Sequence, residues 1–320
     1  MAAVQRNHSP PRHFKSLCYF YLTSCIIIGV HGLTPNDPLW SQIPPPVARR
    51  GILLVSANVP TSITSTSRSQ ALQLISSATA AVVMLATTTA LPLPSQALSP
   101  TEAAADYDTY AASYDQLDGG KASAALGMEQ ARSTLLKKAR GHVLEIGVGT
   151  GLNLQSYDPS QISSLTLCDV SDGMLQQAAN RAKTLPNLQG IPVTFVKADA
   201  TSELVDRFGQ AVFDTVVDSF SLCVMGTPGA RQCLEQMSRV VKLGSAGGHV
   251  LLLENSRSSN SLLGLYQDAT AGAAASTGGK GCVYNQNVGA LIRQTGTLEV
   301  SDETLYAAGL FRSFDCSRIR

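Results

Sequence analysis

Residues 143–154 read VLEIGVGTGLNL, and this stretch decides the fold. An apolar run carrying the acidic residue Glu145 is followed by glycine at every second position, at Gly147, Gly149 and Gly151. Because glycine is costly to order and carries no side chain, three of them in one turn indicate a close approach to the backbone. The residues alone leave two candidates for what approaches, a nucleotide-type ligand or a tight turn of the chain itself.

The spacing of the glycines narrows the class of ligand. A dinucleotide fingerprint, G-x-G-x-x-G, requires glycine where this chain has Leu152, and a phosphate loop requires Gly-Lys-Ser or Gly-Lys-Thr. No lysine or arginine follows the turn to meet a phosphate. The sequence therefore disfavours a dinucleotide-binding site and a phosphate-binding loop, and with them an NAD-dependent oxidoreductase.

The chain around this turn alternates short apolar runs with helical patterns. Strands are predicted at HVLEIGVG, SLTLCDV, VTFVKADA, FDTVVDSFSL and HVLLLENS, with helices at 101–117, 126–138, 173–184, 201–208 and 229–242. Such alternation predicts an α/β fold with a mostly parallel sheet and helices on both faces. In that architecture ligands bind at the carboxyl ends of the strands, which is where the glycine turn lies.

Composition excludes some classes of protein. The chain has 320 residues, of which 44% are hydrophobic and 15% charged, with a net charge of +1. A nucleic-acid binder normally shows a basic face, so no nucleic-acid partner is expected. Seven cysteines lack Cys-x-x-Cys spacing and histidine clusters, so we expect no metal site and mostly reduced core thiols.

Residues 1–100 differ from the rest of the chain and are predicted to be a largely unstructured targeting region. Asp37 is the sole carboxylate, and a basic start with an apolar run over 17–30 is typical of a signal peptide. Residues 71–93 carry no charge and are long enough to span a bilayer, but their Ser, Thr and Ala content also fits a removable signal. The expected domains are therefore 1–100, a presequence with a possible membrane segment, and 101–320, the folded domain.

The layout of the presequence resembles the bipartite address of plastid proteins with a further thylakoid or envelope element. The expected location is thus a plastid, with the mitochondrial inner membrane as the alternative. A poorly defined amino terminus without such a role is the remaining reading.

VLEIGVGTG, LTLCDVS, VKADA and FDTVVDSFSLCVM, in this order, resemble the class I S-adenosylmethionine-dependent methyltransferases over about residues 105–320. The resemblance implies a Rossmann-like sheet of seven strands, ending near 298–306 and 309–319 in a partly antiparallel pair. It implies S-adenosyl-L-methionine as the cofactor. It also implies cofactor-binding roles for Glu145, Gly147, Gly149, Gly151, Asp169, Met174, Asp199, Ala200, Asp218 and Tyr114.

The roles that the resemblance implies differ in kind. Asp169 would hold the two ribose hydroxyls, which suits a carboxylate because it only accepts hydrogen bonds. Met174 would pack on adenine, and Asp199 and Ala200 would read its edge. Glu145 would help to hold the amino group of the cofactor. Each of these side chains also has a plain structural alternative, such as a helix cap or a core position.

Finer details, including Y-D-x-Y-A-x-x-Y-D, L-D-G-G and G-K-G-C, resemble the methyltransferase-11 branch and its single-span organelle members. Tyr107, Tyr110 and Tyr114 share one face of the predicted helix and align with the lid of that branch. Residues 264–281 are expected to form a mobile insertion at the acceptor pocket, and Asn285 to contact the acceptor or cap the last helix. The weak candidates for a catalytic base are Asp218, Glu254, Tyr266 and Asp268.

The expected function is methyl transfer to a small, apolar acceptor such as a quinone-like or thiol compound, met at a membrane where 71–93 serves as an anchor. The alternative is a non-catalytic protein of the same fold that serves as a membrane-bound assembly or interaction factor. The sequence leaves the acceptor and the oligomeric state open.

Overall fold

A computed structural model describes residues 97–117, 126–276 and 281–320. The predicted targeting region and the possible membrane segment 71–93 lie outside the described residues. Among the described residues, no helix combines the length and the apolar character that crossing a membrane requires.

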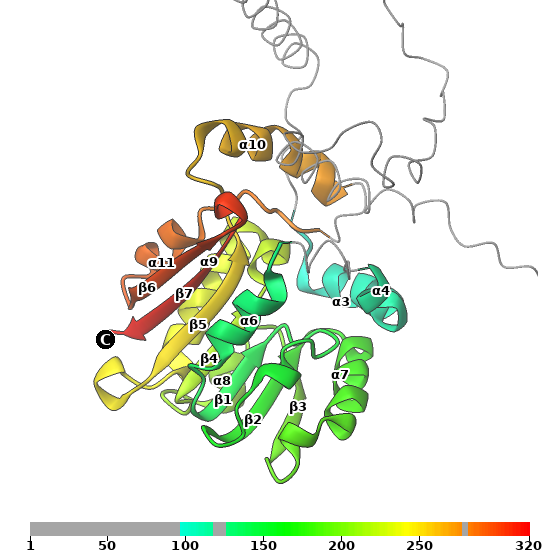
Figure 1. The fold of residues 1–320 in the computed structure, drawn as a ribbon, viewed down its shortest axis with the longest axis vertical. Coiled ribbons are helices and arrows are strands. Elements are labelled where there is room, and N and C mark those ends of the chain that lie inside the picture. Colours follow the sequence, from blue (N-terminus) through cyan, green and yellow to red (C-terminus); the bar gives the residue numbers. More distant parts are fainter. Residues whose placement is uncertain (1–96, 118–125, 277–280) are drawn as a thin grey trace, which may run out of the picture. The chain divides into compact units, whose positions relative to one another are not determined.

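The described residues form a seven-stranded sheet with the order β3-β2-β1-β4-β5-β7-β6 (Figure 1). Strands β1 to β5 run parallel, whereas β7 pairs antiparallel with both β5 and β6. The strand bounds are β1 Gly141–Ile146, β2 Ile162–Asp169, β3 Val193–Lys197, β4 Thr215–Ser219, β5 His249–Asn255, β6 Leu298–Tyr306 and β7 Phe311–Arg318. The predicted Rossmann-like sheet with an antiparallel final pair is confirmed.

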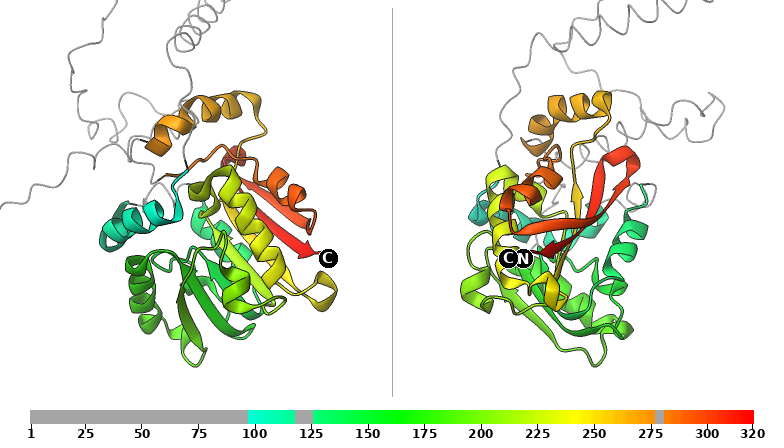
Figure 2. Two further views of the ribbon diagram at one scale, coloured as in Figure 1. Left: turned by 180° about the vertical axis from the view of Figure 1, so that it is seen from behind. Right: turned by 90° about the vertical axis from the view of Figure 1, so that its left-hand side faces the viewer.

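Helices cover both faces of the sheet, as the views from behind and from the side in Figure 2 show. Successive side chains of a strand point to opposite faces of the sheet. Val143 and Leu144 of β1 therefore enter two separate apolar cores. One core is closed by α8 (Leu204–Phe208), α9 (Leu222–Val240) and α11 (Val288–Thr295). The other is closed by α6 (Met128–Leu136) and α7 (Asp172–Thr184).

The first described helices form a separate layer against α7. The chain enters through α3 (Pro100–Tyr110), a 3-10 turn (Ala111–Ser113) and α4 (Tyr114–Leu117). Ser99 caps α3 in a capping box with Glu102, which satisfies two of the free N–H groups at the helix start. The predicted helix over 101–117 is therefore present, with an interruption at its 3-10 turn.

Three expectations about the remaining segments are wrong. The predicted mobile insertion contains a 16-residue helix, α10 (Ser261–Ser276), which an Ala- and Leu-rich sequence favours. Asn287 rather than Asn285 caps α11, since its side chain accepts the N–H of Ala290. Helix α9 begins at Leu222, ahead of the predicted Gly229, with a non-helical residue at Gly226.

Two of the five described cysteines are not the reduced core thiols that the sequence predicted. Cys168, Cys233 and Cys316 are free and buried, as predicted for core thiols. Cys223 and Cys282, however, are joined in a disulfide across 59 positions of sequence. Such a pairing cannot be seen in the sequence, because neither cysteine has a short-range partner.

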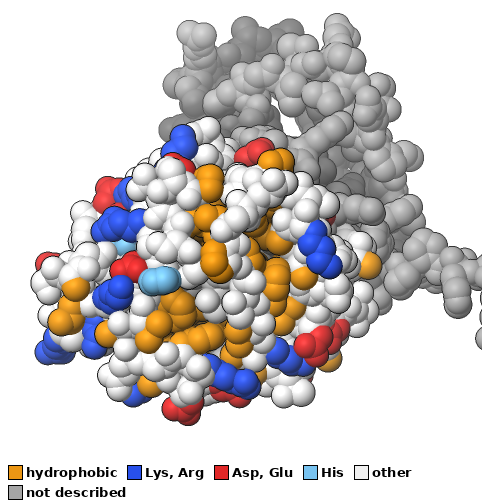
Figure 3. All heavy atoms as spheres, turned by 90° about the horizontal axis from the view of Figure 1, so that it is seen from below, with side chains coloured by type: hydrophobic (Ala, Val, Ile, Leu, Met, Phe, Trp, Pro, Cys, Tyr) orange, Lys and Arg blue, Asp and Glu red, His pale blue; other side chains and the backbone are white. Residues whose placement is uncertain are grey.

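The end of the molecule where the parallel strands begin is seen from below in Figure 3. Lysine and arginine side chains alternate there with aspartate and glutamate, among hydrophobic side chains. This visible face therefore carries no region of a single charge sign of the kind that nucleic acids bind.

Candidate active site

A cavity of about 180 Å³ lies at the carboxyl ends of β1, β2, β3 and β4. It sits where β1 neighbours both β2 and β4, which is the switch point of the parallel strand order. Its wall includes these residues from the strand ends and lid: Tyr107, Tyr114, Gly147, Gly149, Asp169, Met174, Asp199, Ala200, Ser219, Phe220 and Ser221. None of the described lysines and arginines lines it.

The glycine turn is held by the protein itself as much as it is open to a ligand. Gly147 has a φ of +59°, and a Cβ there would lie 2.5 Å from the Cβ of Ser221. Gly149, by contrast, has a φ of +55° with nothing closer than 3.9 Å to a would-be Cβ. Gly151 packs against Leu154 and does not line the cavity. The turn thus serves both candidates that the sequence left open.

Two carboxylates line the cavity at neighbouring strand ends. Asp169, at the end of β2, accepts the N–H of Gly149 at 2.9 Å and the N–H of Ser171 at 3.0 Å. Burial raises the pKa of Asp169, while these N–H groups act in the opposite direction. Asp199, after β3, accepts the N–H and hydroxyl of Thr201 at 2.8 and 2.7 Å. Both carboxylates are therefore fixed in place by local backbone contacts.

Two of the expected contact residues lie behind the cavity wall. Glu145 is buried and accepts hydrogen bonds from Asn153 Nδ2 at 2.9 Å and from the Tyr157 hydroxyl at 2.7 Å. Burial raises its pKa to about 7. Asp218 is also buried and accepts the Ser221 hydroxyl at 2.6 Å. Neither side chain lines the cavity, so each acts on it through its neighbours.

Asp218 belongs to a buried pair of acids with Glu254. Glu254 Oε1 accepts the N–H groups of Ser221 and Leu222 at 3.0 and 3.3 Å, so it caps the start of α9. Burial raises the pKa of Asp218 to about 7, and burial together with the Asp218 charge raises the pKa of Glu254. The second oxygen of each carboxyl lacks a hydrogen-bond partner. Both carboxyl groups are therefore harder to ionise than ordinary ones, and Asp218 changes its protonation state near neutral pH.

The other base candidates are remote from the cavity wall. Asp268 forms a two-oxygen ion pair with Arg257 at 2.8–3.0 Å and also accepts Asn285 Nδ2. The Arg257 hydrogen bonds hold the pKa of Asp268 below its usual range. Neither Asp268 nor Tyr266 is among the residues that line the cavity.

The lid that the sequence predicted is present, and only part of its tyrosine face reaches the cavity. Tyr107 and Tyr114 line the cavity, and their ring centroids lie 6.1 Å apart. Tyr110 does not line it. Met174 and Ala200 are buried and contribute apolar wall on the opposite side.

Sequence reasoning missed the two acidic residues that hold this lid. Asp108 Oδ1 accepts the Ser171 hydroxyl at 2.6 Å and the N–H of Gly173 at 2.8 Å, at the start of α7. Asp115 accepts the Thr150 hydroxyl at 2.5 Å and forms an ion pair with Arg181. The Y-D spacing in the lid contained this signal, because an aspartate beside a helix start is a natural partner for free N–H groups.

Phe220 lines the cavity and has an unusual backbone conformation. Its φ of +60° lies in the left-handed region, which is uncommon for a bulky residue. Its N–H donates to Leu253 O at 2.9 Å, and its ring packs edge-on against Phe311. Such a held conformation is typical of functional sites, where the surrounding structure offsets the local strain.

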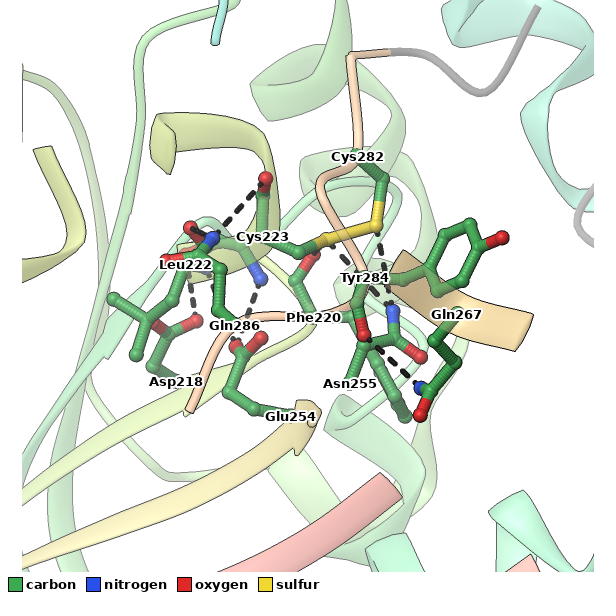
Figure 4. The surroundings of a disulfide bond; sticks show 11 residues. Asp218, Phe220, Leu222, Cys223, Glu254, Asn255, Gln267, Cys282, Tyr284 and Gln286 are labelled. Carbon is green, nitrogen blue, oxygen red and sulfur yellow. Dashed lines mark hydrogen bonds between the residues drawn. A yellow bond between two sulfur atoms is a disulfide. The ribbon is translucent and has the colours of Figure 1, made fainter. Parts of the chain in front are cut away.

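The disulfide lies directly beyond Phe220 and Leu222, as Figure 4 shows. Asn255 Nδ2 points to both sulfurs, at 3.8 Å from Cys223 Sγ and 3.5 Å from Cys282 Sγ. Gln286 Nε2 donates to Leu222 O at 3.0 Å, so the segment after Cys282 is tied to the start of α9 a second time. The wall of the cavity at α9 therefore depends on the segment 281–286.

The described residues can be compared with known metal sites and with known protein families. The described residues contain no group of three or more His, Cys, Asp or Glu arranged to hold a metal ion. Residues 143–244 match the family model described as a methyltransferase domain. The solved structure of the [4+2]-cyclase SpnF shares the fold with a TM-score of 0.52 at 14% identity, over 70% of this chain and 97% of that one.

Two curated relatives match parts of the chain. The mitochondrial methyltransferase OMS1 of Saccharomyces cerevisiae is 26% identical over 182 residues, which is 54% of this chain and 37% of that protein. A phosphatidylethanolamine N-methyltransferase of Cereibacter sphaeroides is 34% identical over 115 residues, or 36% of this chain and 51% of that protein. The chain thus spans about half or less of the length of these relatives.

Strand order, cavity and sequence matches together define the class. The chain contains a class I S-adenosylmethionine-dependent methyltransferase domain, as its sequence predicted.

Proposed function

We infer that this protein binds S-adenosyl-L-methionine in the cavity at the strand ends and transfers its methyl group to a small, apolar acceptor. The observation that carries the inference is the chemistry of the cavity wall. Carboxylates stand at the ends of β2 and β3, apolar side chains lie between them, and the described residues of the wall include no cationic side chain. Such a wall suits a nucleoside with free hydroxyls and disfavours a polyphosphate.

The residues present fit this cofactor. Asp169 offers acceptor oxygens for adjacent hydroxyls, while Met174 and Ala200 supply apolar surface for a base. Tyr107 and Tyr114 place two aromatic rings at the lid, and aromatic faces attract cations. When bound, the cofactor supplies a methyl group on a positively charged sulfur that is already activated for displacement.

The protein's own contribution is mainly to position the reactants and exclude water. Correct alignment alone can supply about 7–11 kcal/mol of the barrier. The lid residues Asp108 and Asp115 hold α3 and α4 over the cavity, and Ser219, Phe220 and Ser221 form its wall at β4.

An acceptor that loses a proton requires a base within reach. Ser221 lines the cavity and its hydroxyl donates to Asp218 at 2.6 Å, so a proton can reach Asp218 through Ser221. A pKa of about 7 suits a base that works near neutral pH. We therefore assign Asp218 as the base, acting through Ser221, for a thiol or phenol-like acceptor.

The test of cofactor binding is calorimetry of the full chain with S-adenosylhomocysteine. The Asp169→Asn variant is expected to bind about 10- to 100-fold more weakly, because it loses charge-assisted hydrogen bonds. Asp172→Asn is the matched control, since Asp172 lies three positions away in an exposed ion pair with Lys197. Absence of binding by the unmodified chain contradicts the proposal.

Methyl transfer is tested separately, with labelled cofactor and organelle extract as the source of acceptor. A labelled small product that partitions into organic solvent supports the proposed acceptor class. Cofactor binding without any labelled product favours the rival function, a non-catalytic assembly or interaction factor of the same fold.

We also propose that the protein works in an organelle, at or near a membrane. The acid-poor presequence and the uncharged segment 71–93 support this, and one relative is described as mitochondrial. A plastid and a mitochondrion remain the two candidates. A fluorescent fusion of the full chain distinguishes them, and mass spectrometry of the mature amino terminus shows whether 71–93 is retained.

A further inference from the structure

Helix α10 buries the polar side chain of Gln267 and exposes two of its three leucines, Leu262 and Leu265, while Leu263 is half-buried. Gln267 is 1% exposed, whereas Leu262 and Leu265 are 81% and 59% exposed. These two are the most exposed large hydrophobic side chains among the described residues. A helix on the surface of a water-soluble domain normally shows the opposite arrangement.

The inward face of α10 is firmly held, so its orientation is not accidental. Gln267 Oε1 accepts the N–H of Ser258 at 2.7 Å, and Gln267 Nε2 donates to Ser256 O at 3.0 Å. Asp268 pairs with Arg257, and the Thr270 hydroxyl meets that of Tyr284 at 2.5 Å. A rotation that buried the leucines would break all of these contacts.

The outward residues share one side of the helix. Leu262, Leu265 and Ala269 are exposed and spaced by three and four positions, which places them in one stripe. The stripe lies at the end of the domain where β5 finishes, since α10 follows β5 directly (Figure 1). That is also the end where the cavity lies.

The chain enters the domain at this same end. Ala97 packs against Gly226 and Leu98 against Gly281, because a Cβ at either glycine would lie within 2.4–2.6 Å of those side chains. Leu98 and Pro100 also line the cavity. The uncharged segment 71–93 ends four peptide steps before Ala97, a reach of at most about 14 Å.

We propose that the Leu262, Leu265 and Ala269 stripe of α10 lies on a lipid bilayer, with the cavity end of the domain facing that bilayer. An apolar, uncharged segment that ends only four residues before Ala97 in the sequence favours lipid as the occupant over a polar protein surface. Exposed apolar side chains on a held helix are the feature that interfacial helices bury between lipid headgroups and chains. It follows, resting on the proposed function, that an apolar acceptor dissolved in the bilayer meets the domain at its cavity end.

The experiment measures where a tryptophan lies relative to the lipid. Trp40 is the chain's one tryptophan, so Trp40→Phe gives a silent background in the full chain. Leu262→Trp and Leu265→Trp each report on the stripe, in phosphatidylcholine vesicles whose lipids carry bromine atoms on their chains. We expect loss of tryptophan emission by the brominated lipid and a shift of the emission to shorter wavelength.

Leu243→Trp is the matched control. Leu243 is 41% exposed and precedes β5, so it lies at the opposite end of the sheet, where hydrophobic side chains also reach the surface (Figure 3). Its emission is expected to remain unquenched. Equal quenching at 243 and 265 contradicts the orientation.

Other outcomes also overturn the proposal. If the full chain does not float with the vesicles, or floats without quenching at 262 or 265, then a protein partner or a second copy covers the stripe instead. Calorimetry with S-adenosylhomocysteine on the same variants reports the cofactor site separately. Failure of the proposed function and failure of this orientation are therefore distinguishable.

Discussion

The glycine-turn region, residues 143–221, and the α10 region, residues 255–276 and 281–286, are held together in different ways. In the first region, some carboxylates bond to near neighbours, as Asp199 does with Thr201 two positions away, although Asp169 also accepts the N–H of Gly149 across 20 positions. In the second, Gln286 bonds to Leu222 across 64 positions, and Cys282 bonds to Cys223 across 59. Local contacts leave a pattern in the sequence, whereas distant contacts do not.

The largest expected effect tests the glycine-turn region. Gly147→Ala is expected to lower the free energy of unfolding by about 2–5 kcal/mol, because it adds a left-handed strain to a clash with Ser221. Gly149→Ala meets open space and is expected to cost only about 1–2 kcal/mol. Urea unfolding measures both, and equal losses would show that the contact with Ser221 contributes nothing.

The next effect tests the α10 region. Cys282→Ser removes the disulfide and is expected to lower the free energy of unfolding by about 2–4 kcal/mol. A reducing agent should therefore lower the melting temperature of the unmodified protein but not that of the variant. Affinity for S-adenosylhomocysteine should fall less than stability does, because Cys282 does not line the cavity and Gln286 still ties the segment 281–286 to Leu222.

Alkylation followed by mass spectrometry provides the control for the disulfide. Under denaturing, non-reducing conditions, Cys168, Cys233 and Cys316 should be labelled, while Cys223 and Cys282 should not. Labelling of all five would contradict the bond.

How much the sequence predicts follows from this difference between regions. Asp169 and Asp199 were placed at the cavity because LTLCDVS and VKADA resemble methyltransferase motifs, and the parallel strands that carry these motifs end at one edge of the sheet. Residues 264–281 were predicted to be a mobile insertion because they are rich in Ala, Gly and Thr. That composition gives no sign of the contacts that support α10, such as the one between Gln267 and Ser258. Glu145 was expected to contact the ligand. The sequence VLEIGVGTG gives no sign that Asn153 and Tyr157 donate hydrogen bonds to both oxygens of its carboxylate.

A third prediction concerns Asp218, the buried acid in β4. Because burial raises the pKa of Asp218 from its ordinary 3.8 to about 7, the folded state binds a proton that the unfolded state has released. Its contribution to stability is therefore lost as pH rises from about 4 to about 7. Asp218→Asn keeps the acceptor for Ser221 without the charge.

The readout is the difference in unfolding free energy between Asp218→Asn and the unmodified protein. It should grow by up to about 4 kcal/mol in favour of the variant between pH 4 and pH 7.5, since each unit of pKa shift is worth about 1.4 kcal/mol. Carboxyl groups with lowered pKa, such as Asp108, act below this window and are common to both proteins. A difference that is constant with pH would contradict the neutral carboxyl.

The smallest effect tests the lid. Asp108→Ala removes two hydrogen bonds to the start of α7, each contributing about 0.5–1.5 kcal/mol. We expect faster amide hydrogen exchange over residues 100–117 and a modest loss of cofactor affinity, with global stability nearly unchanged. Asp106→Ala, at an exposed position in the same helix, should leave exchange as it is.

The contact between Gly147 and Ser221 also bears on the entropy of binding. It joins the turn after β1 to the turn after β4, so the floor of the cavity is set when the sheet forms rather than when a ligand arrives. A ligand that settles on this floor does not have to order it, and more of the contact free energy is left for affinity. The conformational cost of the glycines is therefore met once, during folding.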